Sequence, residues 1–449
     1  MKIAFLSLGC KVNAYETEKM KQEFMEAGFE IVDFNEVSDV YVVNTCTVTN
    51  IADRKSRQML HRAKKHNENA LVVACGCYVD SKEDDNLEKE GILCIENIRK
   101  YDVVNIVLEK LHISKNENTN EAADVSADFM GKKGAHVRAF IKVQDGCNQF
   151  CSYCIIPFVR GELKSRDEKS VEKEVKDLVS LGYKEVVITG IHVSSYGVDK
   201  VYAGEKINSD TFIKLDGKPL LSLLSRLNDI EGLERIRLSS LEPRIITEDF
   251  IESLSKLKKV CPHFHLSLQS GCEETLKSMN RHYTAEEYYK GTCIIRKYYE
   301  NPAITTDIIV GFPGETEENF KETMAFVDKV RFQDVHVFKY SKRQGTVAAA
   351  RKDQVSDRDK SDRSKVLIMK AAEHLEEYCN YYTGKEVEVL IEEIIEMDGE
   401  KYFTGYTKNY VKVYILCHKV SDSGALAAFI NRIVKVRGIK AEDGRLYAE

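Results

Sequence analysis

The chain has 449 residues and a mass of 51.2 kDa, and at about 100–200 residues per domain this length predicts two to four domains. Its 43% hydrophobic and 31% charged residues can form buried cores, which excludes the disordered and fibrous classes. The net charge of −6, from 66 basic and 72 acidic residues, argues against a protein coated in positive charge, so any contact with nucleic acid must be local.

The N-terminal segment shows no pattern typical of export. Its first twenty residues reach charged side chains too early for a secretion signal, and no run of about 18 apolar residues follows anywhere in the chain. We therefore expect a cytoplasmic protein without a membrane partner. Because thiols stay reduced in that compartment, the 13 cysteines are candidate metal ligands, nucleophiles or small buried side chains.

Residues 1–111 alternate short apolar runs with helical stretches. The apolar runs are KIAFLSLG, DVYVVNTC and ALVVACGC, and a basic helix precedes the last of them. This alternation predicts a domain built on a parallel α/β sheet. Residues 112–137 are polar and lack an apolar period, which predicts a flexible linker.

Residues 138–380 repeat the alternation of strand and helix six times. The predicted strands are RAFIKVQDG, EVVITG, RIRLSS, HFHLSLQSG, AITTDIIVG and DVHVFKYS. Six such repeats predict a partial or full β/α barrel of the TIM type. Residues 383–449 are rich in strand patterns with glycine turns, which predicts a small C-terminal β-barrel.

A cluster of cysteines follows the first predicted barrel strand. Cys147, Cys151 and Cys154 form a C-x₃-C-x₂-C pattern on one short loop, where β/α barrels place their active sites. Three thiolates can hold three irons of a [4Fe–4S] cluster and leave the fourth iron open. The alternative is a closed structural zinc site, for which His136 and His192 are candidate fourth ligands without zinc-finger spacing.

This cysteine spacing resembles that of the radical SAM enzymes. The resemblance implies that the three cysteines bind a [4Fe–4S] cluster and that S-adenosylmethionine binds its open iron and is cleaved to a 5′-deoxyadenosyl radical. It also implies that Tyr153, the aromatic residue before the third cysteine, lies beside the adenine of that cofactor. A hydrophobic side chain that covers the cluster is the alternative role for Tyr153.

Several other segments match cofactor-binding positions of these enzymes, with less specificity. Strand alternation places His265, Ser267 and Gln269 on one face of a barrel strand, which indicates either a lined cavity or a satisfied polar core. Arg166 could pair with a carboxylate or lie on the surface. The remaining positions that the resemblance assigns to the cofactor are Thr189, Gly190, Ser239, Ser240, Gly311 and Gly314.

A second set of cysteines lies at the ends of the N-terminal strands. Cys10, Cys46 and Cys77 are about 30 residues apart, but the ends of parallel strands meet at one edge of a sheet, so these residues can converge. Buried structural cysteines are the alternative, and we assign that role to the additional Cys75.

The segments around this second set resemble a branch of the radical SAM enzymes, the methylthiotransferases. They are Gly-Cys-Lys-Val-Asn, Asn-Thr-Cys-Thr-Val-Thr-Asn and Gly-Cys-Tyr. The resemblance implies that Cys10, Cys46 and Cys77 bind a second [4Fe–4S] cluster with an open iron. Asn13 and Asn44 are expected to support the loops through side-chain hydrogen bonds.

Two regions are candidate contacts with RNA. Six Lys or Arg residues lie between Arg54 and His66, which indicates either a phosphate-binding helix or a solvated charged face. The C-terminal region resembles a TRAM domain, an RNA-binding β-barrel. Tyr406 and Tyr410 of its Gly-Tyr-Thr-Lys-Asn-Tyr segment could stack on bases or fill the barrel.

The resemblance covers nearly the whole chain and implies a tRNA methylthiotransferase. Its expected substrate is N6-threonylcarbamoyladenosine in the anticodon loop of tRNA, which would be methylthiolated at C2 with two SAM molecules. The electrons would come from a donor such as flavodoxin or ferredoxin, and no contact with DNA is expected. Alternatives are a methylthiotransferase acting on isopentenyladenosine or on a ribosomal protein aspartate. An alternative of another class is a non-catalytic iron–sulfur protein that binds RNA or senses redox state.

Overall fold

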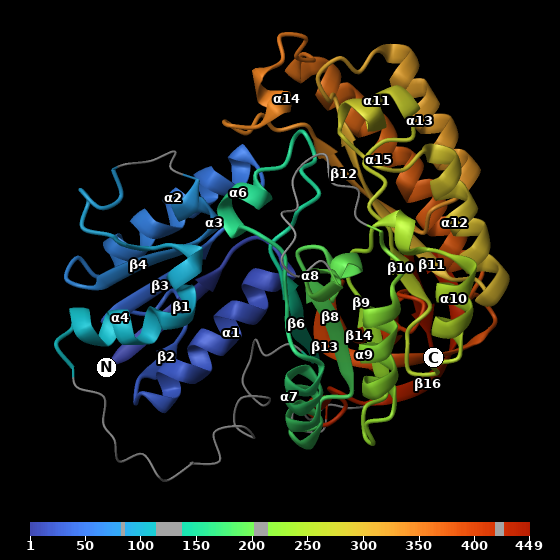
Figure 1. The fold of residues 1–449 in the computed structure, drawn as a ribbon. Coiled ribbons are helices and arrows are strands. Elements are labelled where there is room, and N and C mark those ends of the chain that lie inside the picture. Colours follow the sequence, from blue (N-terminus) through green and yellow to red (C-terminus); the bar gives the residue numbers. More distant parts are fainter. Residues whose placement is uncertain (82–85, 114–136, 202–213, 418–425) are drawn as a thin grey trace.

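The computed structural model of the chain describes residues 1–81, 86–113, 137–201, 214–417 and 426–449 (Figure 1). An N-terminal α/β region, a central region of parallel strands and a C-terminal β-barrel follow one another along the chain. Most of the predicted linker, residues 112–137, lies outside the described residues. Among the described residues, no helix combines the length and apolarity that crossing a membrane requires.

The N-terminal region is a parallel five-stranded sheet in the order β2-β1-β3-β4-β5. Its central strands are almost fully buried because helices cover both faces of the sheet. One face packs on α1 and α4, and the other packs on α2. The elements are β1 (Lys2–Ser7), α1 (Lys11–Glu26), β2 (Glu30–Val32), β3 (Val40–Thr45), α2 (Asn50–His66), β4 (Leu71–Gly76), α3 (Cys77–Asp80), β5 (Leu93–Ile95), the 3₁₀ helix η1 (Asn97–Asp102) and α4 (Val103–Lys110).

The strand order places a topological switch point between β1 and β3. The connection from β1 leads to one side of the sheet, and the connection from β3 leads to the other. Such points are where open α/β sheets build binding sites, beyond the carboxyl ends of the strands. Cys10 and Cys46 follow β1 and β3, and Cys77 follows the neighbouring β4.

The central region contains all six predicted parallel strands. Together with the short strand β7, they form a four-stranded sheet, β7-β6-β8-β9, and a three-stranded sheet, β10-β11-β12. Parallel bridges at Ile236↔Val260 and Leu241↔Leu266 connect the two sheets. The short antiparallel β7 was not predicted. The strands are β6 (Arg138–Asp145), β7 (Lys164–Ser165), β8 (Glu185–Gly190), β9 (Arg235–Leu238), β10 (His263–His265), β11 (Ala303–Val310) and β12 (Asp334–Lys339). The prediction of a partial β/α barrel is confirmed.

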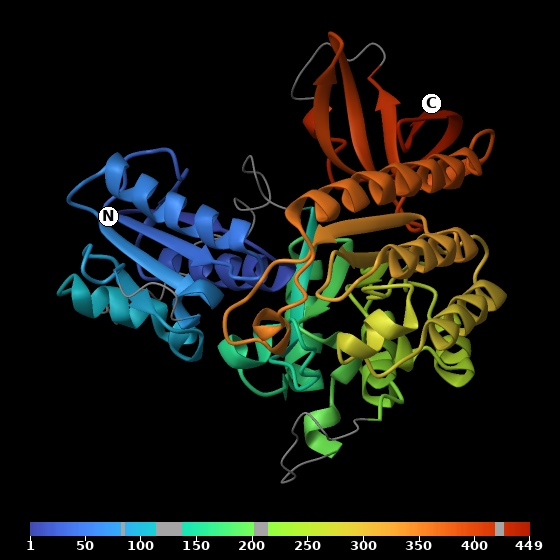
Figure 2. The ribbon, with the colours of Figure 1, turned by 90° about the horizontal axis from the view of Figure 1, so that it is seen from above.

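Helices cover the outer face of this curved sheet (Figures 1 and 2). Alternate strand residues such as Val186, Ile188, Ile236 and Leu238 pack against them in one continuous core. The helices are α6 (Ile156–Arg160), α7 (Glu168–Ser180), η2 (Val193–Ser195), α8 (Val198–Val201), α9 (Lys218–Asn228), η3 (Pro243–Ile245), α10 (Glu248–Ser255), α11 (Glu273–Ser278), α12 (Ala285–Tyr298), α13 (Glu317–Val330), α14 (Val347–Ala350) and α15 (Asp357–Asn380).

The C-terminal region is a closed barrel in the order β13-β14-β15-β17-β16, so the prediction of a small β-barrel is confirmed. It packs on α15 (Figure 2) and on the beginning of the central strands, where Arg235 donates to the Tyr406 carbonyl at 2.9 Å and Arg237 donates to the Lys408 carbonyl at 3.0 Å. Its strands are β13 (Glu386–Met397), β14 (Glu400–Thr407), β15 (Lys412–Leu416), β16 (Ile433–Glu442) and β17 (Arg445–Ala448).

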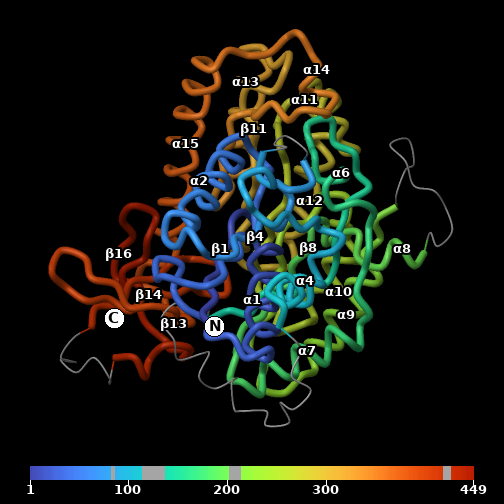
Figure 3. Tube along the Cα trace, turned by 90° about the vertical axis from the view of Figure 1, so that its left-hand side faces the viewer, coloured from blue at the N-terminus to red at the C-terminus, as the bar shows by residue number. Residues whose placement is uncertain are grey.

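The N-terminal region lies against the open side of the central sheet, between its edge strands (Figures 1 and 3). At one edge, Glu16 of α1 pairs with Lys142 of β6 at 2.7 Å. At the other, Arg343 follows β12 and pairs with Asp53 of α2 at 2.6 Å. The carboxyl ends of the N-terminal strands therefore face the inside of the partial barrel.

Candidate active site at two cysteine triads

The first cysteine triad occupies the loop between β6 and α6. Gly146 turns the chain out of β6 with φ +67°, and a Cβ atom there would lie 1.9 Å from the Glu162 carbonyl oxygen, so only glycine fits. The Cys147 amide donates to the Gly161 carbonyl at 3.2 Å, and the Cys154 amide donates to the Cys151 carbonyl at 3.0 Å. These bonds hold the three thiols on one compact loop.

Burial makes this loop unfavourable for free thiolates. It raises the pKa of Cys147 to about 12, with the neighbouring Cys151 adding to the effect, and raises the pKa of Cys154 as well. Arg281 donates to the Cys151 sulfur at 3.1 Å. Three half-buried thiols on one loop, beside the positive charge of Arg281, fit a site for cationic metal.

The second cysteine triad converges across the switch point of the N-terminal sheet. Cys10 caps α1, Cys46 follows β3 and Cys77 begins α3. Gly9, with φ +97°, allows the first two loops to approach, because a Cβ atom there would lie 2.7 Å from the Cys46 sulfur. Burial raises the pKa of Cys46 to about 11, and the charges of Cys77 and Cys10 raise it further.

The sulfur atoms of each triad are spread more widely than a single zinc ion requires. In neither triad do all three sulfurs lie within 4.8 Å of one another. Because Zn–S bonds are about 2.3 Å, two sulfurs on one zinc lie at most about 4.6 Å apart. The wider triads fit a larger polynuclear centre such as a [4Fe–4S] cluster. Of the two candidate zinc ligands, His192 is bonded to Ser195 at 2.6 Å, and His136 lies outside the described residues.

Arg160 connects the two triads. It belongs to α6, directly after the first triad, and its Nε donates to the sulfur of Cys77 at 3.2 Å. Its guanidinium also pairs with Glu16 at 3.1 Å and Asp145 at 3.0 Å, and it donates to Asn13 at 2.6 Å. Helices α3 and α6 pack on each other. The two triads therefore lie on facing sides of the contact between the two regions.

Asn13 and Asn44 support the loops of the second triad. Asn13 donates to the carbonyls of Leu8 at 2.7 Å and Thr45 at 2.9 Å. Asn44 donates to the Asn13 carbonyl at 3.0 Å and to Thr17 at the same distance. The additional Cys75 is fully buried in the core of the sheet, with its sulfur 3.8 Å from the Val43 carbonyl oxygen.

Several predicted SAM-binding residues lie around the first triad. Tyr153 packs edge-on against Phe312 of the Gly311–Gly314 turn, with ring centroids 6.4 Å apart. Both glycines have positive φ, and the Gly311 amide donates to Glu315 at 2.6 Å. Glu315 in turn pairs with Arg363, so it supports the turn, and Thr316 caps the helix that follows.

The other predicted cofactor residues differ in exposure. Thr189, Ser239 and Gln269 are buried, and Ser240 is exposed. Gly190 lies against Gln144. Arg166 pairs with Glu174 at 2.6 Å and donates to Tyr15 at 3.0 Å, so it joins α7 to α1. A cofactor role for these residues stays a prediction.

A buried polar network beside the first triad was not predicted. Arg244 donates to Glu242 at 2.7 Å and to Gln149 at 2.9 Å, and burial lowers the pKa of His192 to about 4. Four buried polar atoms in this area lack a hydrogen-bond partner among the described residues: Ser239 Oγ, Glu242 Oε2, Gln149 Nε2 and His192 Nε2. Orphaned buried atoms fit a polar ligand. Glu242 follows Ser239 at a strand end, which is the signal that could have identified it.

A cavity of about 580 Å³ lies next to this network on the side of Arg281. It contains none of the predicted cofactor residues. Its lining includes Asn280, Arg281, His282 and Tyr283.

The two candidate RNA contacts differ in exposure. Arg54, Lys55, Arg62 and Lys65 of α2 are exposed. By contrast, Tyr406 and Tyr410 stack on each other at 4.6 Å, and Tyr410 stacks on His263 of β10 at 4.2 Å. The two tyrosines therefore neither lie free for bases nor fill the C-terminal barrel, because they pack between that barrel and the central strands.

Comparison with solved structures supports the fold. A radical S-adenosylmethionine methyltransferase, TsrM from Kitasatospora setae, is similar with a TM-score of 0.55 and 14% identity over 78% of this chain and 77% of that chain. The cobalamin-dependent radical enzyme OxsB reaches a TM-score of 0.50 over 78% of this chain and 54% of its own. At these identities the likeness shows the fold alone.

Family profiles and curated relatives identify the chain more closely. The Radical SAM superfamily matches residues 141–327, and "Uncharacterized protein family UPF0004" matches residues 2–124. The threonylcarbamoyladenosine tRNA methylthiotransferase MtaB of Bacillus subtilis is 39% identical over 98% of this chain and 94% of its own. MtaB of Aquifex aeolicus is 37% identical over 92% and 98%. A tRNA-2-methylthio-N(6)-dimethylallyladenosine synthase of Thermoanaerobacter is 36% identical over 96% and 89%. The chain therefore belongs to the radical SAM methylthiotransferase family and is of the MtaB type.

Proposed function

We propose that the protein methylthiolates C2 of N6-threonylcarbamoyladenosine at position 37, in the anticodon loop of tRNA. The relatives named for this nucleoside support the substrate. The observation that supports the proposal is the contact between the two regions beside the triads, where Arg160 of α6, which follows the first triad, donates to the Cys77 sulfur of the second. A nucleobase from a single-stranded loop can enter between the two triads.

The two triads would hold the metal centres. Cys147, Cys151 and Cys154 would hold one [4Fe–4S] cluster with SAM, and Cys10, Cys46 and Cys77 would hold a second cluster. When bound, these groups would supply a 5′-deoxyadenosyl radical and a methylated sulfur. Such cofactor chemistry suits an aromatic C–H bond, which has no acidic proton for a side-chain base to remove.

The side chains around the triads orient the sulfurs and neutralise their charge. Arg281 donates to Cys151 and Arg160 donates to Cys77, and both arginines are held by further partners. Hydrogen bonds to cluster sulfurs stabilise the more negative reduced state. The protein thus favours reduction at both centres.

The buried polar network would bind and shield SAM. Ser239, Glu242 and Gln149 offer unpaired polar atoms, and Tyr153 with Phe312 offers an aromatic wall for the adenine. Because these residues are buried or half-buried, water is largely excluded, which protects a reactive radical.

The exposed cations of α2 support binding of tRNA. Arg54, Lys55, Arg62 and Lys65 project from a helix that begins just after Cys46, so phosphates that bind there lie near the second triad. The reaction would take place in the cytoplasm with the tRNA pool. A small reductant such as flavodoxin or ferredoxin would supply the electrons.

Analysis of tRNA nucleosides tests the substrate. In a strain without the gene, mass spectrometry should show loss of 2-methylthio-N6-threonylcarbamoyladenosine and accumulation of the unmodified threonylcarbamoyl nucleoside. The wild-type gene should restore the product, and a Cys77→Ser gene should not. Loss of the methylthio derivative of dimethylallyladenosine instead would reject the proposed substrate.

The iron content tests the two centres. Reconstituted protein should hold about eight irons per chain if two four-iron clusters form. Cys151→Ala should retain about four and abolish 5′-deoxyadenosine formation, whereas Cys75→Ala, a change in the core, should retain all of them. A wild-type preparation that never exceeds four irons would disprove the second centre.

A further inference from the structure

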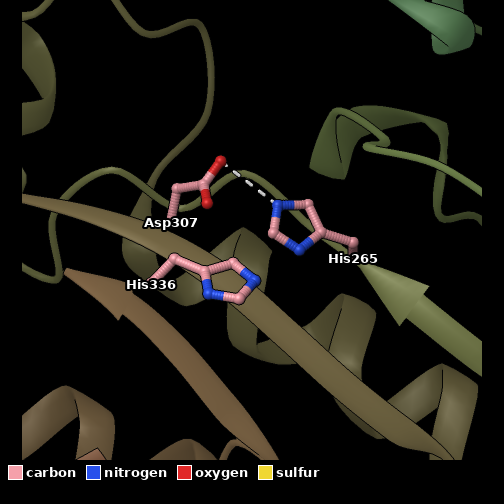
Figure 4. Close-up of side chains that lie close together, drawn as sticks. All are labelled: His265, Asp307 and His336. Atoms are coloured by element: carbon pink, nitrogen blue, oxygen red, sulfur yellow. Dashed lines mark ion pairs between the residues drawn. The ribbon is translucent and has the colours of Figure 1, made fainter. Parts of the chain in front are cut away.

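Three side chains of types that bind metals gather on neighbouring strands of the central region (Figure 4). They are His265 of β10, Asp307 of β11 and His336 of β12, and the last two are direct partners in the parallel register of their strands. One nitrogen or oxygen atom from each lies within 4.8 Å of those of the other two. Among the described residues, no other three His, Cys, Asp or Glu side chains come this close together.

This cluster lies on the inner face of the curved sheet. Val335, the neighbour of His336 on β12, belongs to the core under the outer helices, so the histidine points to the opposite face. Ile309 is two residues after Asp307 on the same face of β11, and it packs in the apolar group around Phe312. The cluster therefore lines the interior of the partial barrel and belongs to neither cysteine triad.

Hydrogen bonding holds His265 with one ring nitrogen toward the cluster. Its Nδ1 is bonded to the Thr305 hydroxyl at 2.9 Å, and its Nε2 lies 3.2 Å from the Asp307 carboxylate. In metal sites, an outer partner on one ring nitrogen fixes the tautomer and the ring orientation, and the other nitrogen binds the ion. Thr305 occupies the position of such an outer partner.

An ion pair of His265 with Asp307 does not account for His336. Figure 4 shows the ring of His336 with its Nε2 side turned toward the other two side chains. Its Nδ1 lies 3.9 Å from Asp334, beyond hydrogen-bond distance, and within the described part of the chain its ring has no hydrogen bond. Because this side chain is 53% exposed, it can turn onto an ion without breaking a bond to the protein.

The donor set indicates the kind of ion. Two imidazoles and one carboxylate suit Zn²⁺ and similar first-row ions, whereas Mg²⁺ and Ca²⁺ prefer oxygen ligands. With bonds of about 2.0–2.1 Å, ligand atoms on a tetrahedral zinc lie about 3.4 Å apart, so closure from the observed spacing needs a movement of about 1 Å. Three protein ligands leave a fourth position for water or another exchangeable ligand.

We propose that His265, Asp307 and His336 bind one divalent transition-metal ion of the zinc type. This site is separate from the centres proposed at the two cysteine triads. Its existence depends neither on the nucleoside that the protein modifies nor on SAM, so the inference goes beyond the proposed function.

Zinc binding to the reconstituted protein tests the site. The full chain is used with both clusters in place, because the cluster cysteines would otherwise bind the probe. Equilibrium dialysis against Zn²⁺ with elemental analysis should give one zinc per chain in addition to the iron. X-ray absorption at the zinc edge should show nitrogen and oxygen ligands at about 2.0–2.1 Å and no sulfur ligands at about 2.3 Å. A shell of sulfur ligands, or the absence of saturable binding, would overturn the proposal.

Variants assign the ion to these residues. Thr305→Val removes only the outer partner and should weaken zinc binding by about 10- to 100-fold. His336→Ala and Asp307→Asn each remove a ligand, so their loss of affinity should be larger. Iron content, measured in the same samples, should stay at the wild-type value in all three.

His61→Ala is the matched control. His61 is a half-exposed histidine that pairs with the Glu90 carboxylate at 2.8 Å, but no third ligand lies beside this pair among the described residues. This variant should bind zinc like the wild type. Equal zinc affinity in His336→Ala and in the wild type would show that the ion binds elsewhere.

Discussion

Arg160 joins the helix that follows the first triad to Cys77 of the second triad. Its buried guanidinium neutralises Glu16 and Asp145 and donates to the Cys77 sulfur. Arg160→Met would leave two carboxylates without this partner, although Lys142 and Lys100 remain near Glu16. We expect a loss of about 3 kcal/mol in the free energy of unfolding, measured in urea.

The same variant should change one cluster and not the other. Without the Arg160 donor, the reduced state of the centre at Cys10, Cys46 and Cys77 is less stabilised, so its reduction potential should fall. Redox titration followed by electron paramagnetic resonance measures both potentials. Arg99→Met, an exposed change in η1, is the control and should move neither. An unchanged potential in Arg160→Met would show that the bond to Cys77 has no electronic effect.

His192 predicts an acid-sensitive fold. Burial holds its pKa at about 4, against about 6.5 in an unfolded chain. Between these pH values the unfolded state binds the additional proton, so stability is full above pH 6.5 and falls as the pH decreases toward 4, by about 3 kcal/mol in total. In His192→Gln the free energy of unfolding, measured by urea denaturation, should decline between pH 7 and 4 by about this amount less than in the wild type. Identical slopes in both proteins would contradict the burial of a neutral ring.

Single residues were predictable where the chemistry is local in sequence. The triad at Cys147, Cys151 and Cys154 is recognisable because its members share one loop. The residues that contact the triads were not predictable from the sequence. Arg160 and Cys77 are 83 positions apart in the chain, and Arg281 and Cys151 are 130 positions apart. No pattern of spacing encodes such contacts, since tertiary packing alone brings them together.

Elements were predictable where the apolar period is long enough. The strands with six or more apolar-patterned residues, such as β3, β4 and β11, were all expected. The edge strands β2 and β5 have three residues each and were missed, because so short a segment has no measurable period. The strand pattern indicated that Cys10, Cys46 and Cys77 can converge, since all three follow parallel strands, whereas their assignment to one cluster came from the resemblance.

The β14 strand depends on one glycine. A Cβ atom at Gly405 would lie 1.8 Å from the Leu390 carbonyl oxygen of β13, beside the register shift between Ile391 and Glu393. Gly405→Ala should therefore force the two strands apart and destabilise the C-terminal barrel by about 1–3 kcal/mol. Since Tyr406 lies next to this glycine and accepts a hydrogen bond from Arg235, the contact with the central region should loosen as well.

Hydrogen exchange measures the effect of this change on β13 and β14. Exchange should accelerate in both strands, while the iron content stays at the wild-type value. Gly291→Ala is the matched control. Gly291 lies within α12, where alanine favours the helix, and a Cβ atom there would make only ordinary contacts, at 3.4 Å. If Gly405→Ala exchanges like the wild type, the strands can separate without cost.

The whole molecule is organised by the way the N-terminal region closes the open side of the central barrel. Sequence patterns predicted each region but not this arrangement, because the contacts are ion pairs between residues more than a hundred positions apart, such as Arg160 with Glu16. The use of Tyr406 and Tyr410 as packing residues against β10 was hidden for the same reason. The proposed active site exists only in the assembled molecule, since each region contributes one triad.

Arg343 tests whether this closure is required for the reaction. It is buried after β12 and binds Asp53, Asn50 and Thr47 around the N-terminus of α2, close to Cys46. Arg343→Met would remove these bonds and leave Asp53 buried without its cation, at a cost of about 3–5 kcal/mol to the contact between the regions.

The first triad lies wholly within the central region, so it should keep its iron and still cleave SAM to 5′-deoxyadenosine. Methylthiolation should fall by about 100-fold, because a shift of about 1 Å between reacting groups is enough for such a loss. Liquid chromatography of both products from one reaction measures the ratio, and Lys342→Met, an exposed neighbour, should match the wild type. A proportional loss of both products would show that Arg343 supports the central region itself rather than the alignment of the two triads.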